Sequence, residues 1–161
     1  MKNYKAPWCI SMIVVSVLAT ALLVGVTVGA QPWAARHGHD WLAWQPLVIV
    51  FGCALFTIRG YSITPDAILV HRLFWATRLP RAGLQSARVD PKAMRRSIRT
   101  CGNGGFFSIS GFYWNKSLGS YRAFVTDPRR AVILKYTRRT VVMSPEPPEE
   151  FVRDLNLPNQ S

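Results

Sequence analysis

The feature that most constrains this chain is a long apolar run, residues 9–30, that contains no charged side chain. About 20 consecutive apolar residues are enough for a helix to cross the hydrocarbon core of a bilayer. A second apolar run, residues 41–58, is near the lower limit of that length, and its interior Gln45, Pro46 and Gly52 are tolerated in a spanning helix. We therefore predict a transmembrane hairpin of two helices, within a membrane anchor that comprises residues 1–58.

The basic residues around the two runs predict the orientation of this hairpin. Lys2 and Lys5 precede the first run, Arg36 stands alone between the runs, and an arginine-rich segment follows the second. Because cytoplasmic flanks carry the excess of Lys and Arg, we expect a multi-pass protein with both termini in the cytoplasm. A cleaved signal peptide is the competing interpretation, since "VGA" at residues 28–30 resembles a cleavage site. Cleavage would leave the second helix as the anchor and the C-terminal domain still cytoplasmic.

The charge of the whole chain predicts an anionic partner. Its 161 residues include 20 Lys and Arg against 8 Asp and Glu, a net charge of +12. Anionic lipid, acidic protein and nucleic acid all fit such a charge. The three cysteines form no CxxC pair, so we expect free thiols in a reducing compartment. His37, His39 and Asp40 offer too few ligands for a closed metal site, and we interpret them as a polar turn.

From residue 59 onward the pattern changes to short β-rich runs separated by turn residues. In "AVILKYT", for example, Val132, Leu134 and Tyr136 share one face of a strand. Seven or eight such runs at regular spacing predict a mainly-β barrel or sandwich. We assign residues 59–161 to this second, cytoplasmic domain.

The last element has helical periodicity. In "PEPPEEFVRDL", Pro148 suits the first position of a helix, and the two glutamates that follow suit its first turn. Phe151, Val152 and Leu155 then line one face. We predict a short amphipathic C-terminal helix that plugs the open end of the barrel and buries Phe151.

The stretches "ITPDAILVHR", "LPRAGLQSARV", "RTCGNGGFFSISG", "LGSYRAFVTDPRRAVILKY" and "VVMSPEPPEEFVRDL", which follow two apolar runs, resemble the bacterial pleckstrin-homology-like (PH-like) domains of small membrane proteins. The resemblance covers about residues 59–157. Its most specific pieces are the loop with Thr100, Gly102 and Gly105, the later Gly111, and the entry "SPEPPEEF" to the helix. It implies a bent barrel of seven strands capped by a helix, a non-enzymatic fold used for lipid or protein recognition.

Two familiar phosphate sites are not expected here. PH domains that grip phosphoinositides carry Lys and Arg around their first hairpin, whereas the turn "TPDA" offers Asp66 and no base. The glycine-rich "CGNGGFFS" lacks the lysine of a nucleotide-binding P-loop. It also fails the dinucleotide pattern GxGxxG, because Gly102 and Gly104 are followed by Phe107. We interpret residues 100–105 as a turn between strands.

The segment "PKAMRRSIR" is the candidate contact for an anionic lipid or a partner. Lys92, Arg95, Arg96 and Arg99 are spaced i, i+3, i+4 and i+7, so two helical turns would place them on one face. Close to a membrane surface, each base contributes about 1 kcal/mol of attraction to anionic headgroups. A solvated loop whose charges only follow the positive-inside bias remains the alternative.

A secondary basic patch is expected from two turns, which carry Arg129, Arg130, Arg138 and Arg139. We do not expect nucleic acid as its partner, because no recognition helix, zinc module or stacking motif accompanies these arginines. The β domain has one histidine, His71, without a nucleophile or paired carboxylates nearby in sequence, so we predict neither an enzyme nor a cofactor.

These features together predict a bacterial inner-membrane protein whose cytoplasmic PH-like domain is a non-catalytic binding or scaffolding module. Its expected contacts are anionic lipid headgroups, a membrane-protein partner or a second copy of the chain. The alternative is an accessory subunit of a membrane complex that acts by protein–protein contact alone and has no lipid ligand.

Overall fold

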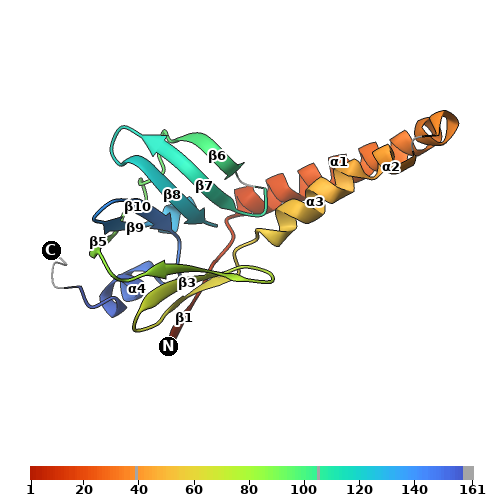
Figure 1. The fold of residues 1–161 in the computed structure, drawn as a ribbon. Helices are drawn as coiled ribbons and strands as arrows, with labels where there is room; N and C mark the ends of the chain where they lie inside the picture. The colour runs from red at the N-terminus through yellow and green to blue at the C-terminus, as the bar shows by residue number, and fades with distance from the viewer. Residues whose placement is uncertain (39, 105, 158–161) are drawn as a thin grey trace.

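The computed structural model describes residues 1–38, 40–104 and 106–157, with the backbone alone for residues 40 and 103. A β-rich body carries a pair of helices that projects away from it (Figure 1). The predicted polar turn at His39, the loop glycine Gly105 and residues 158–161 of the predicted domain lie outside the described residues.

The projecting pair consists of α1 (Ile10–His37), the short α2 (Asp40–Ala43) and α3 (Gln45–Leu55). The helix α1 ends at Gly38, whose φ of 68° is a left-handed conformation that glycine adopts without strain. The chain then returns, and α3 packs along α1 toward the β domain (Figure 1). Most apolar side chains of α1 face outward, and Leu22 is 67% exposed, as in a helix surrounded by lipid rather than by protein.

In the described part of the chain, α1 is the one helix that is long and apolar enough to cross a membrane. With 28 residues its length is about 42 Å. The expected second spanning helix over residues 41–58 is not supported, because α3 has 11 residues and is about 17 Å long. A turn at Trp44 separates α2 from α3, and α3 ends before Phe56.

The β domain contains two sheets. The smaller has the order β1 (Lys2–Lys5), β2 (Gly60–Ile63), β3 (Ala67–His71) and β4 (Ala76–Pro80), with antiparallel pairing throughout. The larger has the order β5 (Leu84–Val89), β9 (Val132–Tyr136), β10 (Thr140–Met143), β8 (Gly119–Val125), β7 (Ile109–Asn115) and β6 (Ile98–Gly104). Only β8 and β10 pair in parallel among these described strands, and the 3₁₀ turn η1 (Pro128–Arg130) begins the crossover between them.

The expected closed barrel of about seven strands is wrong in two respects. The described residues form ten strands, and no strand pairing joins the two sheets, so the fold is an open pair of sheets. Two strands that the sequence did not suggest account for the difference. They are β1, from the N-terminal residues, and β6, from the glycine-rich segment.

The strand β1 belongs to the β domain although its residues precede α1. Tyr4 pairs with Tyr61 of β2 and is 6% exposed. Its ring packs edge-on against Phe151, with ring centroids 5.0 Å apart. The two ends of the described chain therefore meet in one hydrophobic core, on the same side of the helix pair.

The glycine-rich segment forms β6 instead of the predicted turn. Gly102 lies opposite Gly111 of β7, and the two backbones approach so closely that a Cβ on Gly102 would lie 2.6 Å from the Cα of Gly111. Both glycines have positive φ, 115° and 147° respectively. Glycine is required here for close backbone approach, which is a strand feature that resembles a turn signal in sequence.

The main core lies between the two sheets and is covered by α4 (Pro148–Asp154). As predicted, Pro148 begins this helix, and Phe151 and Leu155 are fully buried. The outer face of the larger sheet carries a second cluster, which includes Tyr113 and Tyr121 and is covered by Ala93. The segment that contains the candidate basic residues is therefore packed onto the sheet.

Candidate functional site

The basic segment forms a fixed loop, residues 91–97, which we call the basic loop. Its Ala93 is 2% exposed and packs on the outer face of the larger sheet. The buried Asn115 holds the loop twice, because its Nδ2 donates to the Ala93 carbonyl at 2.8 Å and to Ser97 Oγ at 2.9 Å. Tyr121 donates its hydroxyl to the same Ser97 oxygen at 2.6 Å. Exposed basic side chains thus extend from a backbone held by buried side chains of the sheet.

The two helical turns that would place Lys92, Arg95, Arg96 and Arg99 on one face do not form. Residues 91–96 are successive turns, and Arg96 has a left-handed φ of 55°. Arg99 lies not on the loop but in β6. The four candidate residues are consequently divided, and Arg96 is separated from the other three.

Lys92, Arg95 and Arg99 line an open cavity of about 560 Å³, which we call the basic pocket. Met94 and Ile109 supply part of its apolar wall. The guanidinium of Arg99 lies over the backbone of Gly104, where a Cβ would come within 2.7 Å of Arg99 Nη1. None of the three bases has an ion-pair partner among the described residues. Three unneutralised cations around one cavity suit a phosphate group.

Tyr113 adds a phenol to the wall of the basic pocket. Burial raises the pKa of Tyr113, while the positive charge of Arg99 acts in the opposite direction. The phenol is therefore neutral at physiological pH and leaves the positive charge of the pocket undiminished.

A second cavity, of about 400 Å³, adjoins the basic pocket and shares Gly104, Ile109 and Pro128 with it. Its other wall is the start of α1, including Met12 and Val15. The β6–β7 hairpin touches α1 directly, since the Phe107 amide donates to Ser16 Oγ at 2.9 Å. The basic pocket therefore opens beside the first turns of the apolar helix.

The predicted secondary basic patch does not form as one surface. Arg129 and Arg130 lie in η1, before β9, whereas Arg138 and Arg139 lie in the turn after β9, at its opposite end. The first pair is also largely neutralised. Arg129 Nε lies 3.2 Å from an oxygen of Asp127, and Arg130 pairs with both Asp127 and Glu146.

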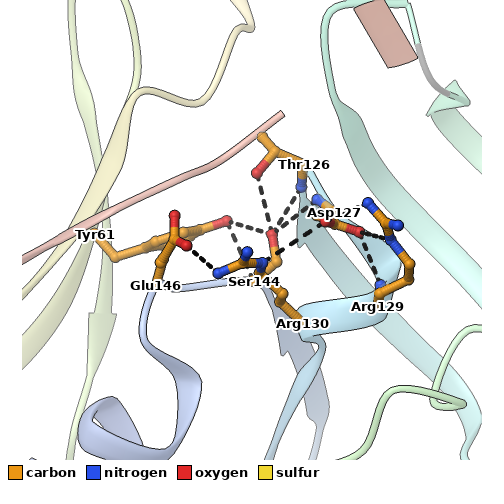
Figure 2. A network of polar contacts seen from close by, with 7 residues as sticks. All are labelled: Tyr61, Thr126, Asp127, Arg129, Arg130, Ser144 and Glu146. Carbon is orange, nitrogen blue, oxygen red and sulfur yellow. Dashed lines mark hydrogen bonds and ion pairs between the residues drawn. The ribbon is translucent and has the colours of Figure 1, made fainter. Parts of the chain in front are cut away.

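Figure 2 shows why these ion pairs are held in place. Ser144 is fully buried, and its hydroxyl accepts hydrogen bonds from the amides of Thr126 and Asp127 at 2.8 and 3.2 Å. Tyr61 of the smaller sheet donates to the Phe124 carbonyl at 2.7 Å and lies 3.4 Å from Ser144 Oγ. This network joins the two sheets and holds Asp127, so the charges of Arg129 and Arg130 are paired although their side chains are 75% and 40% exposed.

Two further arginines, Arg72 and Arg122, were not singled out from the sequence as site residues. Arg72 follows β3 and is 7% exposed, and Arg122 lies half-buried in β8. The available signal was an arginine inside an apolar, aromatic stretch, "ILVHRLFW". In the described residues, no group of three or more His, Cys, Asp or Glu side chains is placed to hold a metal ion.

Two packed sheets with a C-terminal helix form a small β-rich domain, and an exposed apolar helix starts from the same body. The chain matches the family described as "Bacterial PH domain" over residues 59–158. Because the match covers more than half of the chain, the protein belongs to the bacterial PH domain family, which confirms the resemblance seen in the motifs. No curated protein and no solved structure matches the chain significantly.

Proposed function

We propose that this protein is a membrane-anchored, non-catalytic PH-domain module whose basic pocket binds anionic lipid headgroups of its own membrane. The observation that carries the proposal is the position of the pocket. Lys92, Arg95 and Arg99 surround it without ion-pair partners among the described residues, and it adjoins the cavity at the base of α1. A spanning helix that starts there brings the pocket to the membrane surface.

The placement in the membrane follows from the two ends of the chain. Lys2 Nζ lies 2.8 Å from Asp154 Oδ1, so β1 and α4 lie on the same side of any membrane that α1 enters. If α1 crosses the bilayer, residues 38–57 must bring the chain back across it. We propose a multi-pass hairpin with both termini in the cytoplasm of a bacterial inner membrane, α3 being short enough to require local thinning of the bilayer. Arg36 and His37 near the tip of the hairpin favour full crossing, since both are exposed polar groups.

Apolar side chains near the base of the helices support the same placement. The tip between β3 and β4 carries Leu73, Phe74 and Trp75, and Phe74 is 74% exposed. Trp75 packs against Phe56 just after α3, with ring centroids 5.3 Å apart. Aromatic residues at this level are typical of the membrane–water interface.

The energetics are adequate for a tethered domain. Each base near an anionic surface contributes about 1 kcal/mol, so the three together contribute about 3 kcal/mol. That is weak for a free protein, but the anchor holds the domain at a high effective concentration near the leaflet. A modest, salt-sensitive interaction is therefore sufficient.

The test uses the full chain in mild detergent, titrated with a short-chain anionic phospholipid and followed by calorimetry. Arg95→Gln removes a base that lines the pocket, and we expect binding to weaken about fivefold, which corresponds to about 1 kcal/mol. The matched control is Arg96→Gln, the same change on the adjacent exposed residue that does not line the pocket. Equal affinity for anionic and zwitterionic lipid, or equal effects of the two variants, would contradict the proposal.

An accessory subunit that acts by protein contact alone is the second candidate, and one observation favours it. The edge strand β6 carries Ile98, which is 63% exposed, and the neighbouring β7 exposes Phe112 and Trp114. An exposed edge with apolar side chains is a surface on which another chain can add a strand. Co-purification of a stoichiometric membrane protein that is lost on Ile98→Lys, with lipid binding unchanged by Arg95→Gln, would favour this function.

A further inference from the structure

A third cavity, of about 500 Å³, is lined by residues of α3 and of the β6–β7 hairpin. Figure 1 shows α3 returning to the β domain beside this hairpin. We call this cavity the arginine pocket. Its polar wall contains Arg72 and Arg122, and its apolar wall contains Ile49, Phe56 and Phe112. Among the described residues, the arginine pocket shares no lining residue with the basic pocket. Its occupant can therefore be tested separately.

No described residue neutralises the buried charge in this pocket. Arg72 is only 7% exposed. Neither Arg72 nor Arg122 forms an ion pair with a described residue. Burying a cation without a counter-ion is costly, and that cost falls when an anion enters. Burial lowers the pKa of Arg72, and the nearby charge of Arg122 lowers it further.

The hydrogen bonds of Arg72 orient it without satisfying its charge. Nη1 donates to the Phe56 carbonyl at 2.7 Å, Nη2 to Ser110 Oγ at 2.9 Å and Nε to Thr77 Oγ1 at 3.4 Å. All three acceptors are neutral. A guanidinium has five N–H donors, so two remain for an acceptor in the pocket. Both guanidinium groups also lie against the ring of Phe124, at 5.5 Å for Arg72 and 4.8 Å for Arg122.

The apolar wall determines what kind of anion fits. Ile49 and Phe56 belong to α3 and its end, and they are 56% and 48% exposed. Phe112 of β7 also lines the pocket and is 54% exposed. A small soluble anion would leave these side chains uncovered, whereas an amphiphile covers them with its chains. The charge and the apolar surface together match a lipid with a phosphate headgroup.

We infer that the arginine pocket holds one anionic phospholipid as a structural ligand, with its phosphate on Arg72 and Arg122 and its acyl chains along α3. This inference rests on the membrane placement in the proposed function but not on the basic pocket. The lipid would join α3 to the larger sheet and so fix the angle at which the anchor leaves the domain. It differs from headgroup contact at the basic pocket because it is retained as a whole molecule.

Gly52 provides a direct test, because it lines the pocket and a Cβ there meets nothing within 4 Å. Gly52→Leu introduces an apolar side chain into the pocket from a position where its Cβ meets no atom within 4 Å. The matched control is Gly25→Leu in α1, where a Cβ also meets nothing within 4 Å and which does not line the pocket. Arg122→Gln removes the charge at a half-buried position whose guanidinium lies over the rings of Phe112 and Phe124 and forms no ion pair with a described residue.

The full chain is purified from membranes in mild detergent, and bound phospholipid is identified and counted per chain by native mass spectrometry. We expect about one anionic phospholipid on the wild type and on Gly25→Leu, with occupancy lowered about tenfold by Gly52→Leu and by Arg122→Gln. Millimolar inorganic phosphate should not displace it. Wild-type occupancy in both pocket variants, a bound zwitterionic lipid, a bound acidic peptide or displacement by phosphate alone would overturn the inference.

The two proposals fail separately. Arg95→Gln, which weakens headgroup binding at the basic pocket, should leave the retained phospholipid in place. Loss of the retained lipid in that variant would contradict a separate site at Arg72 and Arg122. If titrated headgroup binding is absent while the retained lipid persists, the basic pocket fails and the arginine pocket stands.

Discussion

At the scale of single residues, the pair Gly102 and Gly111 shows how a backbone requirement can be mistaken for a turn. The two lie opposite each other, and a Cβ on Gly111 would come within 2.8 Å of the Cα of Gly102. Gly111 also has a φ of 147°, which L-residues with side chains rarely adopt. Sequence reasoning identified the glycines but not the contact between them, because that contact depends on the pairing of β6 with β7.

Gly111→Ala should therefore destabilise the protein more than an ordinary substitution of a positive-φ glycine. The matched control is Gly119→Ala, at a φ of 68° where a Cβ meets nothing within 4 Å. The control should cost about 1–2 kcal/mol for the left-handed backbone, and Gly111→Ala about 2 kcal/mol more for the overlap. Urea unfolding of the detergent-solubilised chain, followed by tryptophan fluorescence, measures both. Equal losses would show that the two strands separate at little cost.

Asp154 gives a prediction about pH. Its carboxylate accepts hydrogen bonds from Lys2 Nζ, at 2.8 Å, and from the Tyr4 hydroxyl. The hydrogen bond from Lys2 and then that from Tyr4 lower the pKa of Asp154 below its ordinary 3.8. Because the pKa is lower in the folded state, the stabilisation is complete above the unfolded pKa and is lost as the pH falls through the folded value.

Asp154→Asn should thus lower the melting temperature at pH 7, and the difference from the wild type should begin to shrink as the pH falls below about 4 and disappear only below the lowered pKa of the folded state. Glu149→Gln is the control, because Glu149 lies on the same helix and contacts neither Lys2 nor Tyr4 in the described structure. Thermal unfolding at several pH values measures the three proteins. A difference that persists unchanged at acid pH would mean that Asp154 acts through something other than its charge.

At the scale of elements, α4 was predictable and β1 was not. Pro148 and the buried face of Phe151 and Leu155 are local signals, readable within one helix. The sequence "KNYK" of β1 has no such signal, because only Tyr4 of its four residues is apolar, and it shares its face of the strand with Lys2. Its pairing with β2 depends on a partner more than fifty residues later, and such long-range pairing is invisible to local patterns.

The residues of the candidate sites likewise fall into those that local sequence patterns identify and those that they do not. Charge spacing identified Lys92, Arg95 and Arg99, which line one pocket, because clustered exposed bases are visible in sequence. It could not separate Arg96 from them, since the left-handed turn at that residue follows from packing of the basic loop on the sheet. Arg72 and Arg122 were missed because their importance lies in burial and in the lack of a described counter-ion, both of which are tertiary properties.

The strand β1 makes a prediction about stability. Tyr4→Ala removes a ring that is 6% exposed and packs on Phe151, so it should cost about 3 kcal/mol. Lys5→Ala on the same strand should cost much less, because the Lys5 side chain is exposed and the backbone pairing with Gly60 is kept. Urea unfolding compares them. Similar small losses would show that β1 is detached in solution.

At the scale of the whole molecule, the contact between β1 and α4 limits how the chain can pass through a membrane. Residues 2–5 and residues 59–157 form one body, and the helix pair leaves it and returns to it (Figure 1). A single crossing by α1 would place β1 and the remaining strands on opposite sides of the membrane, which the shared core forbids. If α1 enters a membrane, the chain therefore either crosses it twice, or the hairpin enters it from one side without crossing it.

Reporter fusions distinguish these arrangements. A cytoplasmic reporter placed after Ser161 should be active and a periplasmic reporter there inactive, because the excess of Lys and Arg in the body that holds both ends favours the cytoplasmic side. A cysteine substituted at Arg36, in a chain whose three native cysteines are replaced by serine, should react with a membrane-impermeant maleimide in intact cells whose outer membrane is permeabilised. Reaction only after lysis would instead indicate a hairpin buried from the cytoplasmic side, and periplasmic activity after Ser161 would contradict the topology and the site at the inner leaflet together.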